Sequence, residues 1–309
     1  MPKFTVSKQK IISAPLGQVY DEVRDFNSWR RWSPWLIIEP DCSLTYSPSG
    51  DSYGWAGQVI GSGKMTVTAE EKNKWIVYDL EFFKPWKPTA KVRMNFREVS
   101  DGVSDGVEVT WTMDSSLRFF MFWMVGMMEG LIGMDYDRGL AMLKDQIELG
   151  GVSSKLEFSG EKQIAGFRYL GKERECPIAD IGKTMEADIA KLKNIVEKCG
   201  IKSKGKPFAV YHKWDLKKKV ARFTIGLPIE NSSTSYSEGV FSADMPPVSV
   251  YSIRHTGLDR HVGNAWAAGI SHGWAKKFKQ SRKAHPFEIY EQQAEEGVES
   301  VTLVCFPKK

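Results

Sequence analysis

The segment PFAVYHKWDLKKKVARFTIGLP, residues 207–228, aligns without gaps with PFEIYEQQAEEGVESVTLVCFP, residues 286–307. A second matched pair lies upstream, IAGFRYLG at residues 164–171 and VYSIRHTG at residues 250–257. In each copy a helical pattern separates the two matched blocks, so the order strand, helix, strand, strand occurs twice. Because order and spacing agree, we predict an internal duplication of a βαββ unit rather than a chance similarity of β-rich segments.

The first half of the chain has a different pattern, in which strands precede a long helix. After an alternating first strand, Ser13 and Pro15 provide an N-cap and a first-turn proline for a short helix. Alternating or β-branched stretches then predict an antiparallel meander at residues 53–60, 64–71, 75–83, 89–99 and 107–114. Helical spacing of Leu140, Leu143 and Ile147 predicts one long helix over residues 116–149. We expect a curved sheet that grips this helix.

The seam between the halves is the run Gly150-Gly151-Val-Ser-Ser, which ends the long helical pattern. The chain of 309 residues is also longer than one hydrophobic core usually organises. We therefore predict an α+β protein with two domains, residues 1–150 and residues 155–309.

Composition and cysteine spacing exclude several classes of protein. With 42% hydrophobic and 26% charged residues, the chain is neither wholly disordered nor fibrous. The four cysteines lie far apart and form no C-x-x-C pair, so we expect free thiols, no metal site and no cofactor. No secretory signal pattern is visible at the N-terminus, so we expect a cytoplasmic protein. Our leading hypothesis also takes it to be bacterial.

Two features invite a membrane or a nucleic-acid interpretation. The apolar stretch of residues 119–134 is interrupted by Glu129 and three glycines and falls short of the roughly 20 apolar residues that a bilayer needs. We interpret it as a buried helix and expect no membrane partner. Residues 155–309 carry most of the basic excess, but no helix-turn-helix, zinc-finger or ribonucleoprotein motif accompanies it, so we expect no direct nucleic-acid binding.

The first half resembles a known superfamily through two motifs. They are VYDEVRDFNSWRRWSPW at residues 19–35, with its W-x-x-W-x-P-W run, and DYDRGLAMLKDQIE at residues 135–148. Together with the meander, these are similar to the polyketide cyclase/START-like (SRPBCC) superfamily. The resemblance implies a helix-grip fold around an apolar cavity, and it identifies a fold rather than a reaction.

Aromatic and Met side chains are the candidates to line such a cavity, because they adapt to concave volumes. The candidates are Trp111, Phe119, Trp123 and Met127, with simple filling of the core as the alternative for each. No histidine occurs in residues 1–150, which excludes a Ser-His or Cys-His nucleophile within this half.

The second half resembles the GyrI-like effector-binding superfamily, which is also appended to AraC-type regulators. The second copy carries the clearer signature, VYSIRHTG, a Trp-containing helix and then PFEIYEQ. The resemblance implies two βαββ units about a pseudo-twofold axis, with a ligand-facing glutamate that corresponds to Glu288. The first copy has Ala209 at the matching position, so only one carboxylate is expected.

Strand alternation extends this candidate site without the resemblance. Successive residues face opposite ways, so Glu288 and Tyr290 share one face, and the duplication relates Tyr211 to Tyr290. By the same alternation Tyr251 and His255 share a face, and further wall residues are expected on the following helix at Trp266 and Trp274. Aromatic rings around a carboxylate suit a cationic or amphipathic guest. The alternatives are an exposed carboxylate at Glu288 and a half-buried structural histidine at His255.

The sequence thus predicts a small-molecule-binding protein, a sensor or an accessory of transcription regulation without its own DNA-binding segment. It would act through a protein partner or as a homo-oligomer. The alternative is an enzyme, a hydrolase or cyclase in which Glu288 acts as general base and Tyr211 or Tyr290 orients the substrate.

Overall fold

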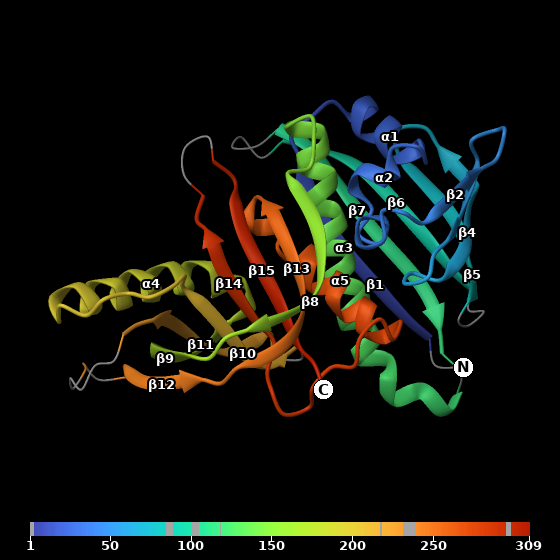
Figure 1. Cartoon of the computed structure of the whole chain (residues 1–309). Helices are drawn as coiled ribbons and strands as arrows, with labels where there is room; N and C mark the ends of the chain where they lie inside the picture. The colour runs from blue at the N-terminus through green and yellow to red at the C-terminus, as the bar shows by residue number, and fades with distance from the viewer. Residues whose placement is uncertain are drawn as a thin grey trace. The chain divides into compact units, whose positions relative to one another are not determined.

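The computed structural model describes residues 3–84, 89–100, 105–117, 119–216, 218–230, 236, 239–294 and 298–309, and of Phe119 and Met121 the backbone alone. The chain divides into two compact units, Met1–Ser153 and Ser154–Lys309 (Figure 1). That each unit folds as an independent domain stays a prediction.

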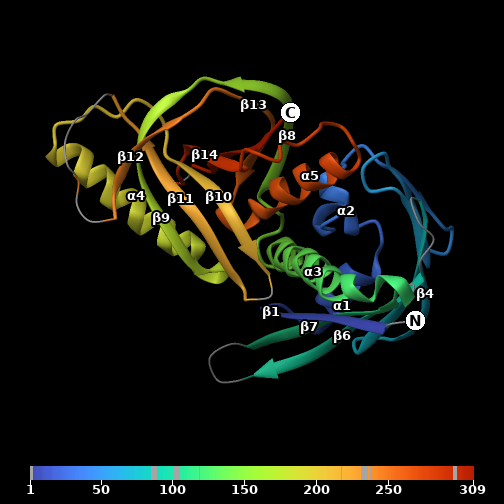
Figure 2. The ribbon, with the colours of Figure 1, turned by 90° about the horizontal axis from the view of Figure 1, so that it is seen from below.

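The first unit is a seven-stranded antiparallel sheet with a long helix on one face (Figure 2). The strand order is β1-β7-β6-β5-β4-β3-β2. The strands are β1 (Lys3–Ile12), β2 (Ser43–Tyr46), β3 (Ser52–Ala56), β4 (Ser62–Glu71), β5 (Trp75–Lys84), β6 (Thr89–Ser100) and β7 (Asp105–Ser116). The helical elements are α1 (Leu16–Arg24), α2 (Trp29–Trp32), η1 (Leu36–Ile38), η2 (Phe119–Met124) and α3 (Val125–Glu148). The predicted helix-grip class is confirmed.

Alternation explains why this sheet is buried on one face only. On β7, every second side chain from Val107 to Met113 points into the core, and β6 follows the same period. Helix α3 places Tyr136, Leu140 and Leu143 on this face. The core between helix and sheet is therefore built of large side chains that interdigitate.

The second unit is an eight-stranded sheet in which the two copies of the repeat meet at the centre. Its strand order is β12-β9-β11-β10-β14-β15-β13-β8. The strands are β8 (Ser154–Ile164), β9 (Phe167–Pro177), β10 (Phe208–Asp215), β11 (Val220–Pro228), β12 (Phe241–Met245), β13 (Val248–Gly257), β14 (Phe287–Gln292) and β15 (Ser300–Pro307). The helical elements are η3 (Ile178–Asp180), α4 (Ile181–Lys198), η4 (Asp259–His261) and α5 (Gly263–Trp274).

The duplication is visible in this order. One copy contributes β9, α4, β10 and β11, and the other contributes β13, α5, β14 and β15. In the sheet the first copy has the strand order β9-β11-β10, and the matching strands of the second copy follow in the opposite order, β14-β15-β13. Strands β10 and β14 pair antiparallel, with Ala209 directly opposite Glu288. These are the two positions that the sequence alignment equates, so a pseudo-twofold relation holds and the predicted duplicated βαββ class is confirmed.

The expectation of a buried helix over residues 119–134 is corrected. The segment begins with the short helix η2, and only then does α3 start at Val125. One side of α3 reaches the core through Val125, Met128 and Ile132. Side chains on its other side are exposed, because a helix lying on one face of a sheet has one buried stripe however apolar its sequence is.

The close approach of α5 to the sheet depends on a glycine. A Cβ at Gly269 would lie 1.9 Å from Cε2 of Phe306, which is itself buried against Trp266. We expect Gly269→Ala to lower the free energy of unfolding by about 2 kcal/mol, because the ring has no room to retreat. The matched control is Gly182→Ala in α4, where a Cβ meets nothing within 4 Å; there alanine should stabilise by a few tenths, up to about 1 kcal/mol. Urea denaturation followed by circular dichroism measures both, and equal effects would contradict the packing argument.

Candidate functional site

The candidate site of the second unit is centred on Glu288 in the central strand β14. The residue is 3% exposed and lies opposite Ala209, where the two copies of the repeat join. The pleat points its side chain to the same face as that of Tyr290. A carboxylate is almost never buried to this extent without partners, so its surroundings decide its role.

Three hydrogen-bond donors from three elements hold the carboxylate. The hydroxyls of Tyr211 on β10 and Tyr290 on β14 donate to Oε2, at 2.8 Å and 2.7 Å. The indole Nε1 of Trp266 on α5 donates to Oε1 at 2.5 Å. From α4, the Sδ of Met185 lies 2.9 Å from the Tyr290 hydroxyl. Both copies of the repeat therefore contribute to one buried polar cluster.

The electrostatics of this cluster are unusual because all three donors are neutral. Burial raises the pKa of Glu288, and the hydrogen bonds from Trp266, Tyr290 and Tyr211 oppose that shift without cancelling it. Burial and the neighbouring carboxylate raise the pKa of both tyrosines, which keeps them protonated as donors. Among the residues that the structure describes, no Lys or Arg pairs with Glu288. When Glu288 is ionised, its charge is hydrogen-bonded but has no cationic partner among the described residues.

Aromatic rings enclose the carboxylate further. Tyr211 stacks on Trp214 with ring centroids 5.2 Å apart and meets the edge of Trp266 at 5.0 Å. Sequence reasoning missed Trp214, because it lies three positions after Tyr211 and a regular strand would put the two on opposite faces. A register shift between Tyr211 and Lys213 restores the shared face. The one signal in the sequence for this contact is Trp214 itself, a bulky aromatic residue at a position that regular alternation would point outward.

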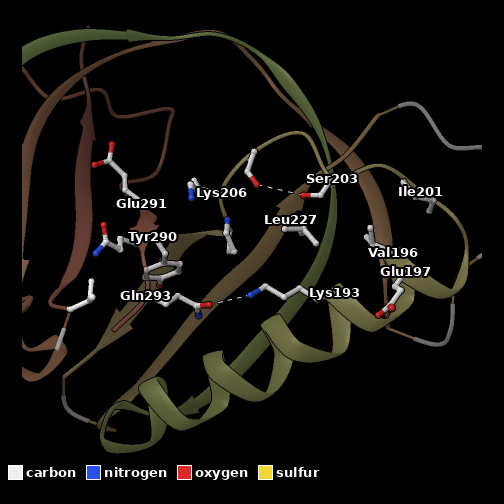
Figure 3. Close-up of a pocket in the computed structure, with 14 residues that line it drawn as sticks. Lys193, Val196, Glu197, Ile201, Ser203, Lys206, Leu227, Tyr290, Glu291 and Gln293 are labelled. Carbon is white, nitrogen blue, oxygen red and sulfur yellow. Dashed lines mark hydrogen bonds between the residues drawn. The ribbon is translucent and has the colours of Figure 1, made fainter. Parts of the chain in front are cut away.

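A cavity of about 700 Å³ lies beside the cluster (Figure 3). Tyr290 forms part of its wall (Figure 3), and the Tyr290 hydroxyl donates to Glu288, which is not among the residues that line the cavity. At the α4 side, Lys193 Nζ donates to Gln293 Oε1 at 3.1 Å. The lining residues are Lys193, Val196, Glu197, Ile201, Ser203, Gly205, Lys206, Pro207, Leu227, Tyr290, Glu291, Gln292, Gln293 and Val298.

Three further candidates of this unit lie away from Glu288. His255 is completely buried, with Nε2 3.1 Å from Ser154 Oγ. The Tyr251 hydroxyl lies 2.8 Å from His272 Nδ1, and its ring stacks on Phe278. Trp274 at the end of α5 is exposed. The structure thus brings together Glu288, Tyr290, Tyr211 and Trp266, and it gives Tyr251, His255 and Trp274 other surroundings.

In the first unit, the predicted cavity is largely filled. Trp111 is completely buried, stacks on Tyr136 at 4.1 Å and meets Trp29 and Trp32 edge-on. A cavity of about 60 Å³ remains, lined by Trp35, Leu36, Tyr53, Trp55, Ile60, Met65, Leu80 and Phe82.

Two other candidates of this unit, Trp123 and Met127, do not line that cavity. Trp123 and Met127 are exposed, which corrects the expectation that they enclose an apolar volume, and the Phe119 side chain is outside the described residues. The reason is the one-sided burial of α3 described above.

Comparison with known proteins gives one family match. Residues 3–148 match the family described as polyketide cyclase / dehydrase and lipid transport. No curated protein matches the chain.

Solved structures that match part of the chain include the EcmrR C-terminal domain, which is 17% identical and aligns with 50% of this chain and 98% of its own at a TM-score of 0.42. EcmrR in its DNA complex is 15% identical, with 63% and 73% covered and a TM-score of 0.43. The Aha1 dimer from Colwellia psychrerythraea is 15% identical, with 48% and 98% covered and a TM-score of 0.35.

The helix-grip architecture and the family match agree over the same residues, and the second unit has the duplicated βαββ topology described above. Residues 3–148 are therefore similar to the polyketide cyclase/dehydrase family in both sequence and architecture, and the second unit has a duplicated βαββ fold.

Proposed function

We propose that the second unit binds a cationic, amphipathic small molecule through Glu288. The observation that carries the proposal is a buried carboxylate held by three neutral donors with no described Lys or Arg beside it. Burying an anion without a counter-charge costs free energy, and a bound cation would recover part of that cost. The site is thus arranged for a positive charge that the described residues of this unit do not supply.

The aromatic rings suit the same guest. Cation–π attraction contributes about 0.5 to 2 kcal/mol per ring when the cation lies over a face. Tyr211, Trp214 and Trp266 surround the carboxylate, and the cavity beyond Tyr290 is lined by both apolar and charged residues. In this proposal the body of an amphipathic molecule lies in the cavity, and its charge reaches Glu288 when the Tyr290 side chain turns aside.

Binding at this site would serve sensing in the cytoplasm, with the signal passed to a protein partner or to a second copy of the chain. Four free cysteines, of which Cys42 and Cys305 are buried, suit a reducing compartment. The enzymatic alternative, with Glu288 as general base, is less well supported. Three hydrogen bonds already occupy the carboxylate oxygens that would have to accept a substrate proton.

The test is calorimetric titration of Glu288→Gln with tetraphenylphosphonium as cationic probe and triphenylphosphine oxide as neutral probe. The wild-type protein should prefer the cation, and Glu288→Gln should weaken its binding by about tenfold or more while leaving binding of the neutral probe unchanged. Because the pKa of Glu288 is raised and a cation favours the ionised form, affinity should increase with pH in the wild type and be flat in the variant.

The matched control is Glu291→Gln on the same strand. Glu291 lines the cavity, but its carboxylate already pairs with Arg254 at 3.1 Å. Its replacement should therefore change the affinity much less. Equal losses in the two variants, or wild-type affinity in Glu288→Gln, would contradict the proposal. Turnover of an electrophilic ester that loses its acid limb in Glu288→Gln would favour the enzymatic alternative instead.

A further inference from the structure

We propose that the first unit docks on an anionic lipid bilayer through an aromatic tip formed by Phe120, Phe122, Trp123, Met127 and Met134. Phe120, Phe122 and Trp123 are 66%, 64% and 69% exposed, and the two methionines 46% and 39%. Three large aromatic side chains this far out of the protein lie within one short helix, η2. Both views show this segment close to the amino terminus, beyond the start of α3 (Figures 1 and 2).

The first turns of α3 carry apolar side chains both on the side that faces the core and on the side that faces solvent. Val125, Met128 and Ile132 pack against the core, while Met127 and Met134 point away from it. A helix that is apolar all round is stable in water only when both sides are covered. The aromatic tip therefore lacks a cover on its outer side, which marks an interaction surface.

The chemistry around the tip favours lipid as that cover. Protruding Phe and Trp side chains partition into the headgroup boundary of a bilayer, where Trp is enriched. Lys3 is the first residue of β1 and lies opposite Ser116, the last residue of β7, just before η2. Lys84 is the last residue of β5, so it lies at the same end of the strands. Both lysines are exposed and have no ion pair in the part of the chain that the structure describes.

The charges around the aromatic tip and the lengths of the helices indicate how the protein would bind the bilayer. Exposed lysines beside an apolar surface attract anionic headgroups, whereas carboxylates would be repelled. From residue 119 to residue 134, Glu129 is the one acidic residue, and it is half-buried. No helix in the described parts of the chain is long and apolar enough to cross a membrane. The tip would therefore lie in the interface and leave the sheet outside it.

The experiment is flotation of the full-length protein with vesicles of phosphatidylcholine alone or with about a third phosphatidylserine. We expect the wild type to float with the anionic vesicles and to remain behind with the neutral ones. The partition coefficient of the double variant Phe122→Ser/Trp123→Ser for the anionic vesicles should be at least about tenfold lower, because the variant loses two inserted rings. Replacement of Lys3 and Lys84 by Glu should abolish the preference for phosphatidylserine while leaving the fold intact.

The matched control is Trp274→Ser in the second unit, because Trp274 is also 69% exposed. Its replacement should leave flotation unchanged, and circular dichroism should show that all variants are folded. Failure of the wild type to float with anionic vesicles overturns the proposal. So does an equal loss in Trp274→Ser, or a concentration-dependent dimer that Phe122→Ser/Trp123→Ser dissociates without any vesicle binding, which would assign the tip to a second copy. None of these three results bears on Glu288, so failure here is separate from failure of the proposed ligand site.

Discussion

Replacement of Asp188 by Ala is expected to lower the free energy of unfolding of the second unit by about 3 to 5 kcal/mol. Asp188 is 2% exposed on α4, and its carboxylate accepts hydrogen bonds from Lys172 and Arg174 on β9. Burial opposes its ionisation, but the hydrogen bonds and charges of these two cations outweigh burial and lower the pKa of Asp188. Alanine removes the partner and leaves the ammonium of Lys172, which is 8% exposed, buried without a counter-charge.

The measurement is urea denaturation of the full chain followed by tryptophan fluorescence. Asp137→Ala is the matched control, since the ion pair between Asp137 and Lys8 is solvent-exposed and should contribute less than about 1 kcal/mol. Combining Asp188→Leu with Lys172→Met should recover much of the loss, because a well-packed apolar pair replaces both charges. A loss in Asp188→Ala no greater than in Asp137→Ala would show that α4 does not depend on this cluster.

Asp188 and Glu288 are two buried carboxylates of one unit whose pKa values shift in opposite directions. Asp188 has two cationic partners and a lowered pKa. Glu288 has three neutral donors and a raised pKa. The first arrangement stabilises the fold, whereas the second maintains a charge whose neutralisation is left to another molecule. This contrast is the reason to assign the ligand to Glu288 rather than to the other buried acid.

Much of the fold could be predicted from periodicity in the sequence, but the extent to which the apolar segment of residues 119–134 is buried could not. Alternation predicted the antiparallel meander of the first unit, helical spacing predicted its long helix, and the repeat predicted the two βαββ copies of the second unit, but none of them predicted β2, β8 or β12. The exposure of Trp123 and Met127 was not predictable in this way. A stretch that is apolar in every direction has no period to show which side meets the core.

The candidate site shows the same division. Alternation places Tyr290 beside Glu288, and the repeat brings Tyr211 to them. Tyr251 and His255 share a face as expected, but their strand β13 is separated from β14 by β15, which puts it about 10 Å away across the sheet. Strand order was therefore the missing information, since a shared face does not bring together residues on strands that are not neighbours.

Acidification from about pH 6.5 to about pH 4 is expected to destabilise the second unit by about 3 kcal/mol through His255. The pKa of His255 is lowered to about 4, mainly by burial and also by the nearby charge of His261, while Asp259 and Glu299 oppose the shift. The Nδ1 atom is buried without a hydrogen-bond partner among the described residues. Because the folded state binds this proton less readily than the unfolded chain, stability is complete above the unfolded pKa and is lost as pH falls through the window.

Glu288 contributes with the opposite sign, which the experiment must separate. Its raised pKa means that the folded state gains stability as pH falls and the carboxylate is neutralised. The measurement is therefore the free energy of unfolding against pH in the Glu288→Gln background, where the loss attributed to His255 should be larger than in the wild type. Adding His255→Gln should flatten the profile between pH 6.5 and 4, whereas His285→Gln at an exposed position should not. A profile that stays steep after His255→Gln would place the acid sensitivity in another group and leave the buried imidazole with no role in it.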